Sequence, residues 1–121
     1  HSKGGIVGKH VMVIDDRDGS HQQRVDRLVA IASPFNGSAM ARVAPNRELR
    51  AFLPDNPVIV ALAGHRSVNA RITSIYPSFD PHIPDGCLLE GAHNVELAVV
   101  GHFRILLSPA VIDAVREAVA R

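Results

Sequence analysis

The chain has 121 residues, of which 46% are apolar and 21% charged, and its formal net charge is +1. These figures are typical of a globular domain and exclude an intrinsically disordered chain. The 13 Lys and Arg residues nearly balance the 12 Asp and Glu residues, so the basic field of a nucleic-acid-binding protein is missing and we expect no nucleic-acid partner. The single cysteine, Cys87, cannot form an internal disulfide. No apolar run reaches the roughly 20 residues of a membrane-spanning helix, so we expect no integral membrane segment.

The first predicted element is a helix over residues 5–14, because side chains suited to a buried face recur there at spacings of three and four. That face is expected to carry Ile6, Val7, His10, Val11 and Ile14. A polar turn over residues 15–20 follows. Residues 24–33 then predict a strand, because the apolar run at 28–32 is typical of a strand buried on both faces of a parallel sheet.

Two short helices are predicted next, over residues 45–53 and 57–64. The second is expected to begin after Asp55 or Asn56 as its N-cap, with Pro57 in its first turn. Both segments are rich in apolar side chains, which we expect to share one face of the first helix and to be buried in the second.

The second half of the chain predicts two strands and a closing helix. β-branched and apolar side chains mark strands over residues 71–76 and 94–100. Ser108 and Pro109 open the helix as N-cap and first helical residue. Its inward face is expected to carry Val111, Ile112, Val115 and Val119. Together these elements predict an α/β fold in one domain over residues 1–121, with about three mainly parallel strands flanked by helices.

A serine motif stands at the beginning of the sequence. His1-Ser2-Lys3-Gly4-Gly5 carries most of G-x-S-x-G, the nucleophile elbow, in which a serine sits on a strained strand-to-helix turn with its hydroxyl exposed. The two glycines allow the following helix to approach the sheet closely. The N–H of Lys3 would lie at a helix N-terminus, where it can point at a developing oxyanion.

A serine nucleophile needs a histidine and an acidic residue beside it. Two later residues follow predicted strands and could supply them. Asp80 follows the strand at 71–76, and His102 follows the strand at 94–100. Because the carboxyl ends of parallel strands meet at one edge of a sheet, we expect Ser2, Asp80 and His102 to converge. Asp85, on the same loop as Asp80, is the alternative acid.

With these motifs the sequence resembles the lipases and esterases of the α/β-hydrolase fold, in particular the bacterial triacylglycerol-lipase-like members. The likeness covers nearly the whole chain and corresponds to the C-terminal half of that fold, from the nucleophile elbow onward. The segments that carry it are His1–Gly5, the turn Ala32-Ser33-Pro34-Phe35-Asn36-Gly37-Ser38, the Asp80 and Gly101-His102 segments, and Leu89–Val95.

The resemblance implies a serine hydrolase of carboxylic esters that acts through an acyl-enzyme. Ser2 would attack the ester carbonyl, His102 would take its proton and return it to the leaving alcohol, and Asp80 would orient the imidazole. Lys3 would supply half of the oxyanion hole. The implied partner is an ester or lipid substrate, and no metal or organic cofactor is implied. The phenylalanines beside these turns, which either line an acyl pocket or belong to the core, are Phe35, Phe79 and Phe103.

The sequence departs from the family pattern in beginning inside the motif. In the family a strand enters the elbow, and earlier strands carry the second oxyanion N–H. We therefore expect an open sheet edge, which favours a homo-oligomer or pairing with an N-terminal segment, and weak or no esterase activity of this chain alone. The alternative function is a non-catalytic hydrolase remnant that serves as an oligomeric scaffold or binding module, and an acyltransferase or thioesterase is a third possibility.

Seven histidines raise the hypothesis of a metal site, with His82, His93 and His102 near Asp80 as its candidate ligands. None of them has the spacing of a known zinc motif, so no metal is predicted. The acidic residues at 15–18 do not have the register of a calcium loop and are interpreted as part of a surface turn.

Overall fold

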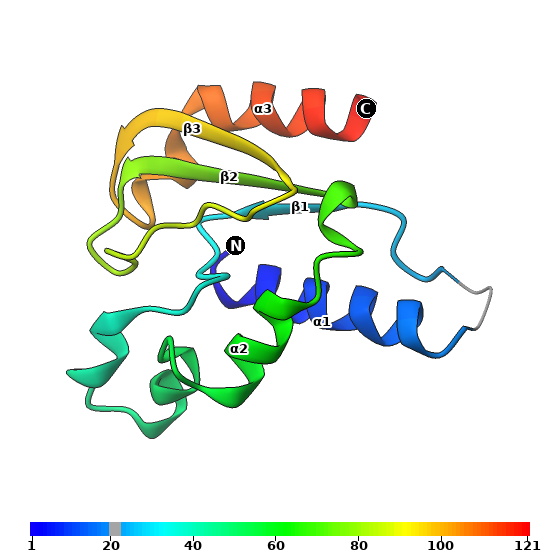
Figure 1. The fold of residues 1–121 in the computed structure, drawn as a ribbon. Coiled ribbons are helices and arrows are strands. Elements are labelled where there is room, and N and C mark those ends of the chain that lie inside the picture. The colour runs from blue at the N-terminus through cyan, green and yellow to red at the C-terminus, as the bar shows by residue number, and fades with distance from the viewer. Residues whose placement is uncertain (20–22) are drawn as a thin grey trace.

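A three-stranded parallel sheet forms the middle layer of the computed structural model, which describes residues 1–19 and 23–121 (Figure 1). Its strands are β1 (Leu28–Ile31), β2 (Ile72–Phe79) and β3 (His93–Val100), in the order β1-β2-β3. The predicted α/β class with three parallel strands is confirmed. All three strands point in the same direction, so their carboxyl ends share one edge.

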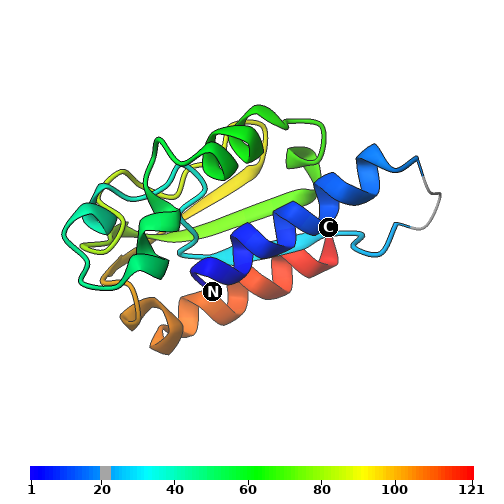
Figure 2. The ribbon, with the colours of Figure 1, turned by 90° about the horizontal axis from the view of Figure 1, so that it is seen from below.

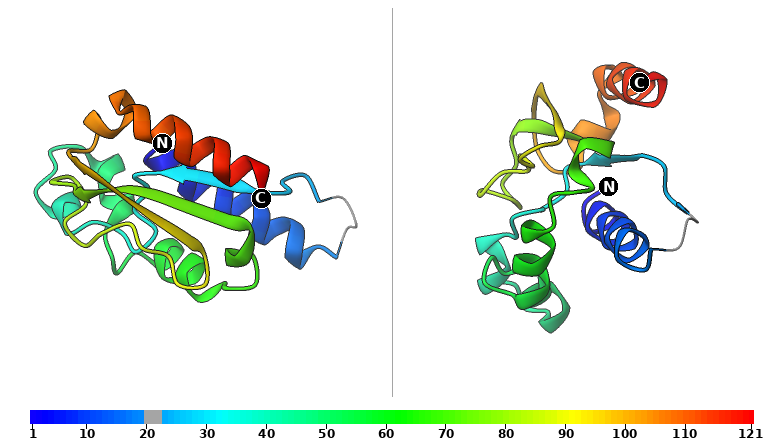
Figure 3. Two further views of the ribbon diagram at one scale, coloured as in Figure 1. Left: turned by 90° about the horizontal axis from the view of Figure 1, so that it is seen from above. Right: turned by 45° about the vertical axis from the view of Figure 1, so that its right-hand side comes forward.

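Helices cover both faces of the sheet. They are α1 (Lys3–Arg17), α2 (Pro57–Gly64) and α3 (Pro109–Ala120). Figure 2 shows α1 and α3 running along β1, and Figure 3 shows α3 on one face of the sheet with α1 and α2 on the other. The remaining helical turns are short 3₁₀ segments, η1 to η4, at Ala39–Arg42, Arg47–Phe52, Asn69–Arg71 and Arg104–Leu107.

The helix predicted over residues 45–53 is one of these 3₁₀ segments, because the run between its cap and Pro54 is short. The helix predicted over residues 57–64 is confirmed. Of its two candidate caps, Asn56 is the N-cap, since its side-chain oxygen accepts a hydrogen bond from the N–H of Val58 at 2.9 Å.

Strand β1 is shorter than the predicted strand at 24–33, and its residues are mostly half-buried rather than buried on both faces. The backbone before β1 bonds outside the sheet: the N–H of Arg24 donates to the carboxylate of Asp15, and the carbonyl of Val25 accepts from the side chain of Arg71. With these groups engaged elsewhere, pairing with β2 begins at Leu28.

The two faces of the sheet have separate apolar cores. Buried side chains on the α1 and α2 face are Ile6, Met12, Val13, Ala30, Phe35, Ile59, Leu62, Val68, Ile72 and Leu89. Those on the α3 face are Ala32, Ile75, Ile105, Val111 and Ala114. Strand β2 contributes to both cores, as a central strand of a parallel sheet must.

The buried face of α1 differs from the prediction. Val7, His10 and Ile14 are exposed, whereas Lys9 and Met12 are buried. The reason is that α1 meets β1 through glycines: a Cβ at Gly5 would lie 3.0 Å from the Cβ of Ala30, and one at Gly8 would lie 2.7 Å from a methyl of Leu28. Glycine carries no apolar signal, so the sequence pattern points to the wrong side of this helix.

Helix α3 is also rotated relative to the prediction. Of the predicted inward residues, Val111 is buried and Val115 half-buried, but Ile112 and Val119 are exposed. Ala114 and Ala118 are buried in their place. Small alanines contact the sheet here, and they contribute less to a hydrophobic pattern than the larger residues beside them.

The predicted turn at 15–20 begins later than expected, because α1 continues to Arg17. Asp15 is buried, and its carboxylate accepts hydrogen bonds from the backbone and side chain of Arg24 at 3.1 and 2.6 Å. These bonds lower the pKa of Asp15 below its ordinary value. Its oxygens are therefore engaged in an ion pair rather than available as calcium ligands. Ser20, the last residue of the predicted turn, lies outside the described residues.

Strand β1 is an edge strand of the sheet. Within residues 1–19 and 23–121 no other strand pairs with it, and its one bond in that direction is the N–H of Ser2 donating to the carbonyl of Ile31 at 2.9 Å. None of the described helices is long and apolar enough to cross a membrane.

The contact between α1 and β1 gives a matched test with two neighbouring glycines. We expect Gly5→Ala to lower the free energy of unfolding by about 1–3 kcal/mol, because the new Cβ would lie 2.6 Å from the Cβ of buried Ser33. Gly4→Ala meets nothing within 4 Å, so it should stabilise the helix by up to about 1 kcal/mol. Urea denaturation of both variants measures the difference, and equal effects would contradict the close approach at Gly5.

Buried Lys9 predicts a pH-dependent stability. Its ammonium makes no hydrogen bond among the described residues, and burial lowers its pKa from 10.5 to about 8. Between these pH values the unfolded chain binds more protons than the folded one, so stability rises with pH. We expect Lys9→Met to raise the unfolding free energy by about 3 kcal/mol below pH 8, with the gain shrinking toward pH 10.5.

Thermal unfolding of Lys9→Met across this pH range, with exposed Lys3→Met as the control, tests the effect of the buried ammonium. Lys3→Met should show no such pH-dependent difference from the wild type. A Lys9→Met variant no more stable than the wild type at pH 7 would contradict the assignment.

Candidate active site

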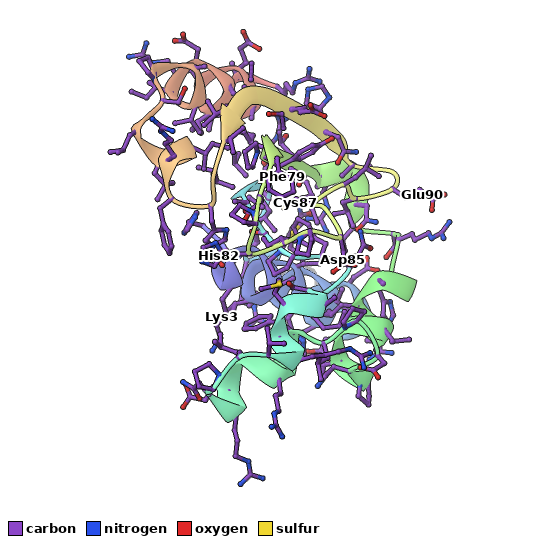
Figure 4. The ribbon with its side chains drawn as sticks, turned by 90° about the vertical axis from the view of Figure 1, so that its left-hand side faces the viewer. Lys3, Phe79, His82, Asp85, Cys87 and Glu90 are labelled. Carbon is purple, nitrogen blue, oxygen red and sulfur yellow. The ribbon has the colours of Figure 1, made fainter. Side chains whose placement is uncertain are left out.

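The predicted site residues lie at the carboxyl edge of the sheet. Ser2 immediately precedes α1, Asp80 directly follows β2, and His102 follows β3. The chain from residue 80 to 92 has no helix and returns along the α1 and α2 face to the start of β3. Figure 4 looks onto this edge and labels Lys3 together with His82, Asp85 and Cys87 of the returning loop.

Ser2 has the backbone geometry of a sharp turn between a strand and a helix. Its φ of 51° and ψ of −122° are strained for a residue with a side chain. The conformation is held by the bond from its N–H to Ile31 and by α1, which begins at the next residue. The N–H of Lys3 lies in the first turn of α1, where a helix offers no acceptor of its own, so it is available to bind an anion.

A chain of hydrogen bonds joins the three predicted residues. The hydroxyl of Ser2 donates to Nε2 of His102 at 3.1 Å, and Nδ1 of His102 donates to Oδ2 of Asp80 at 2.7 Å. The side chains of His102 and Asp80 are only 6% and 3% exposed. With its proton on Nδ1, His102 presents a lone pair to the serine hydroxyl, as a general base requires. The structure brings these residues together, and their catalytic role stays a prediction.

Neighbouring groups hold His102 in place. Nε2 of His1 donates to the carbonyl oxygen of His102 at 3.0 Å, and the two rings lie 4.7 Å apart. Gly101 has a φ of 116°, which favours glycine, and its N–H donates to the carbonyl of Phe79 at 2.9 Å. Sequence analysis did not identify His1 as a supporting residue, since nothing in the pattern indicates that its ring packs against residue 102.

The alternative acid does not reach the histidine. Asp85 accepts a hydrogen bond from the N–H of Ala39 at 2.7 Å, while the second oxygen of Asp80 accepts from the N–H of His82 at 2.8 Å. Asp80 is therefore the carboxylate that is hydrogen-bonded to His102. Asp85 instead ties the returning loop to η1.

The turn at 32–38 is also hydrogen-bonded to the returning loop. The hydroxyl of Ser38 donates to the carbonyl oxygen of His82 at 2.6 Å, and the N–H of Ser38 donates to the carbonyl of Phe52 at 2.6 Å. Gly37 permits the second bond, because a Cβ there would lie 2.7 Å from that carbonyl oxygen and its φ is 78°. This segment thus links the returning loop to η2.

Asn94 closes the returning loop before β3. Its side-chain oxygen accepts from the N–H of Leu89 at 2.9 Å, and its amide nitrogen donates to the carbonyls of Leu89 and Ala92 at 2.9 and 3.2 Å. The stretch Leu89–Val95, which contributes to the family resemblance, therefore serves to fix the path into β3.

A cavity of about 470 Å³ opens beside Ser2 and His102. Most of its lining is apolar and comes from the turn at 32–38, the segments around η1 and η2, and the loop ends near the site. The apolar lining residues are Pro34, Met40, Ala41, Val43, Ala44, Leu49, Phe52, Ile83 and Phe103.

The three phenylalanines considered from the sequence have different positions. Phe103 lines the cavity, Phe35 is buried in the core beneath α1, and Phe79 is exposed on another part of the surface. Phe52 was missed as a lining residue, because in the sequence it belongs to the apolar face of a predicted helix. The interpretation as an acyl pocket therefore applies to Phe103 and not to the other two candidates.

The histidine cluster proposed for a metal is only partly assembled. His93 begins β3, at the opposite end of the sheet from His102. His82 lies beside His102, with ring centroids 4.9 Å apart. Asp80, His82 and His102 each offer one possible ligand atom, and these atoms lie within 4.8 Å of one another.

Cys87 is not a competing nucleophile. It is buried, and burial together with the charge of Asp80 raises the pKa of its thiol to about 12. The reactive thiolate is therefore a negligible fraction near neutral pH.

No protein-family model, curated protein or solved structure matches the chain. The likeness to α/β hydrolases consequently rests on the motif residues and on the geometry at the carboxyl edge of the sheet.

Proposed function

We propose that this chain is a serine hydrolase of carboxylic esters, similar to lipases and esterases. The observation that supports this most strongly is the hydrogen-bonded chain from Ser2 through His102 to Asp80, built on a serine with a strained turn geometry. An ordinary exposed serine requires neither feature. Their combination at the carboxyl edge of a parallel sheet favours a nucleophile over a structural serine.

The reaction would proceed in two halves. Oγ of Ser2 attacks the ester carbonyl carbon while Nε2 of His102 takes the hydroxyl proton. The bond to the alcohol oxygen then breaks, and His102 gives that oxygen the proton. Water next attacks the acyl group on Ser2, His102 takes a proton from the water, and the acid leaves as the proton returns to Ser2. Asp80 stabilises the imidazolium in both halves.

The N–H of Lys3 would stabilise the tetrahedral intermediate at the N-terminus of α1. It is the one oxyanion donor that we assign among the described residues. Removing a single oxyanion donor typically costs about 10²–10³-fold in rate, so this N–H would make a large contribution to the proposed reaction.

The cavity favours an apolar acyl group as the part of the substrate that is bound. Ser2 and His102 form one side of it, so an acyl chain seated in the cavity would present its carbonyl to the nucleophile. The apolar lining provides burial for alkyl carbons and few polar partners that would select a charged substrate.

Labelling with a fluorophosphonate probe tests the proposed activation of Ser2. We expect an adduct on Ser2, located by peptide mass spectrometry and absent from Ser2→Ala. Asp80→Asn should slow labelling by about 10³–10⁴-fold, because the imidazole loses its orienting acceptor. Asp85→Asn is the matched control and should label at nearly the wild-type rate. No adduct on a folded wild-type chain, or equal losses in the two aspartate variants, would overturn the proposal.

Filling the cavity tests its role as the acyl site. Ala44 is half-buried in the lining, so Ala44→Trp should lower kcat/KM for an octanoyl ester relative to an acetyl ester by at least about tenfold. Ala61→Trp, on the exposed side of α2, is the control and should leave the ratio unchanged. An unchanged ratio in Ala44→Trp would assign the acyl chain to another surface.

The open edge of β1 favours the second candidate function, an oligomeric scaffold. Exposed apolar residues on the two helices that run along this edge, Val7 of α1 and Ile112 of α3 among them, would be covered by association. Light scattering distinguishes the candidates together with the labelling. A stable homo-oligomer with an inert Ser2 supports the scaffold.

A further inference from the structure

We propose that Asp80, His82 and His102 form an inhibitory Zn²⁺ site that switches off Ser2. The effect on Ser2 rests on the proposed hydrolase function, whereas the binding of the ion does not. His82 has no role in the proposed reaction. It is nevertheless positioned, two residues after Asp80, against the ring of His102.

The ligand atoms are already close to a metal-binding arrangement. Nδ1 of His82 lies 3.8 Å from Oδ1 of Asp80, and Nδ1 of His102 lies 2.7 Å from Oδ2. Ligands at the usual zinc distances of about 2.0–2.2 Å in a tetrahedral arrangement are about 3.4 Å apart. Shifts of these side chains by about an ångström would therefore accommodate the ion.

The donor set favours zinc over the hard cations. Two imidazole nitrogens and one carboxylate oxygen suit Zn²⁺, whereas Mg²⁺ and Ca²⁺ prefer oxygen ligands alone. The His82 side chain is 61% exposed and borders the cavity, so the ion has a path from solvent. The nearly buried carboxylate of Asp80 supplies a negative charge that offsets part of the charge of the metal.

Zinc at this position would inactivate the site because it would shift the imidazole proton of His102 from Nδ1 to Nε2. A neutral imidazole has one N–H, and in His102 that proton lies on Nδ1, facing Asp80. When Nδ1 binds the metal, the remaining proton must be on Nε2. Nε2 then donates a hydrogen bond and cannot accept the proton of Ser2. The nucleophile loses its base, and removal of the metal restores it.

The test measures zinc binding and Ser2 labelling separately. Competition with a chromogenic zinc indicator should show one site on the folded chain, and saturating Zn²⁺ should slow fluorophosphonate labelling by at least about tenfold. EDTA should restore the rate, and equal concentrations of Mg²⁺ or Ca²⁺ should have no effect.

Two histidine variants assign the site. His82→Phe retains a ring against His102 but removes a ligand, so at least about tenfold more Zn²⁺ should be needed for binding and for inhibition. His93→Phe changes an exposed histidine at the opposite end of the sheet and should respond like the wild type. Circular dichroism checks folding, and His82→Asn replaces His82→Phe if the latter does not fold.

The outcomes separate the two proposals. No zinc binding by the wild type, or the same zinc sensitivity in His82→Phe as in the wild type, overturns the zinc site. A Ser2 that never labels overturns the hydrolase proposal alone, because binding of one Zn²⁺ that weakens in His82→Phe still supports the site. A Ser2 that labels equally well with and without Zn²⁺ overturns the inhibitory site alone.

Discussion

The buried hydrogen bond between His102 and Asp80 is the interaction on which the site depends. It joins the carboxyl ends of β2 and β3, which are neighbours in a parallel sheet, at a distance of 2.7 Å. With Asp80 accepting at Nδ1, Nε2 of His102 has its lone pair directed at Ser2. The same carboxylate also accepts a hydrogen bond from the N–H of His82. The Asp80 side chain therefore orders both the ring of His102 and the start of the returning loop.

The loop between β2 and β3 is the part of the fold that gives the site its shape. It carries the acid, it borders the cavity through Ile83, and it is fastened to the turn at 32–38 by Ser38 and to η1 by Asp85. The chain around the start of α1 has two energetically unfavourable features. Ser2 has a positive φ, and the ammonium of Lys9 on α1 is buried. Such unfavourable features persist only where the surrounding packing compensates for them.

Much of the candidate site could be predicted from the sequence, because its residues directly follow elements that the pattern predicts well. Asp80 and His102 come just after runs of β-branched residues, and Ser2 precedes a helical run, so a parallel sheet brings them to one edge. His1 and Phe52 could not be placed in the same way. The position of His1 depends on which rings pack against each other, and that of Phe52 on how the 3₁₀ segments turn. Neither leaves a periodic signal in the sequence.

The sequence by itself determined the α/β class, the parallel strands and the order in which the candidate residues occur, because hydrophobic runs and caps act over a few neighbouring residues. Only the tertiary structure decided which faces of α1 and α3 are buried, since glycines and alanines allow close contact without contributing to a hydrophobic pattern. It also decided that Asp80 and not Asp85 meets His102, and that His82 lies beside them while His93 does not. These choices depend on the path of a loop, which is set by long-range hydrogen bonds and not by local propensity.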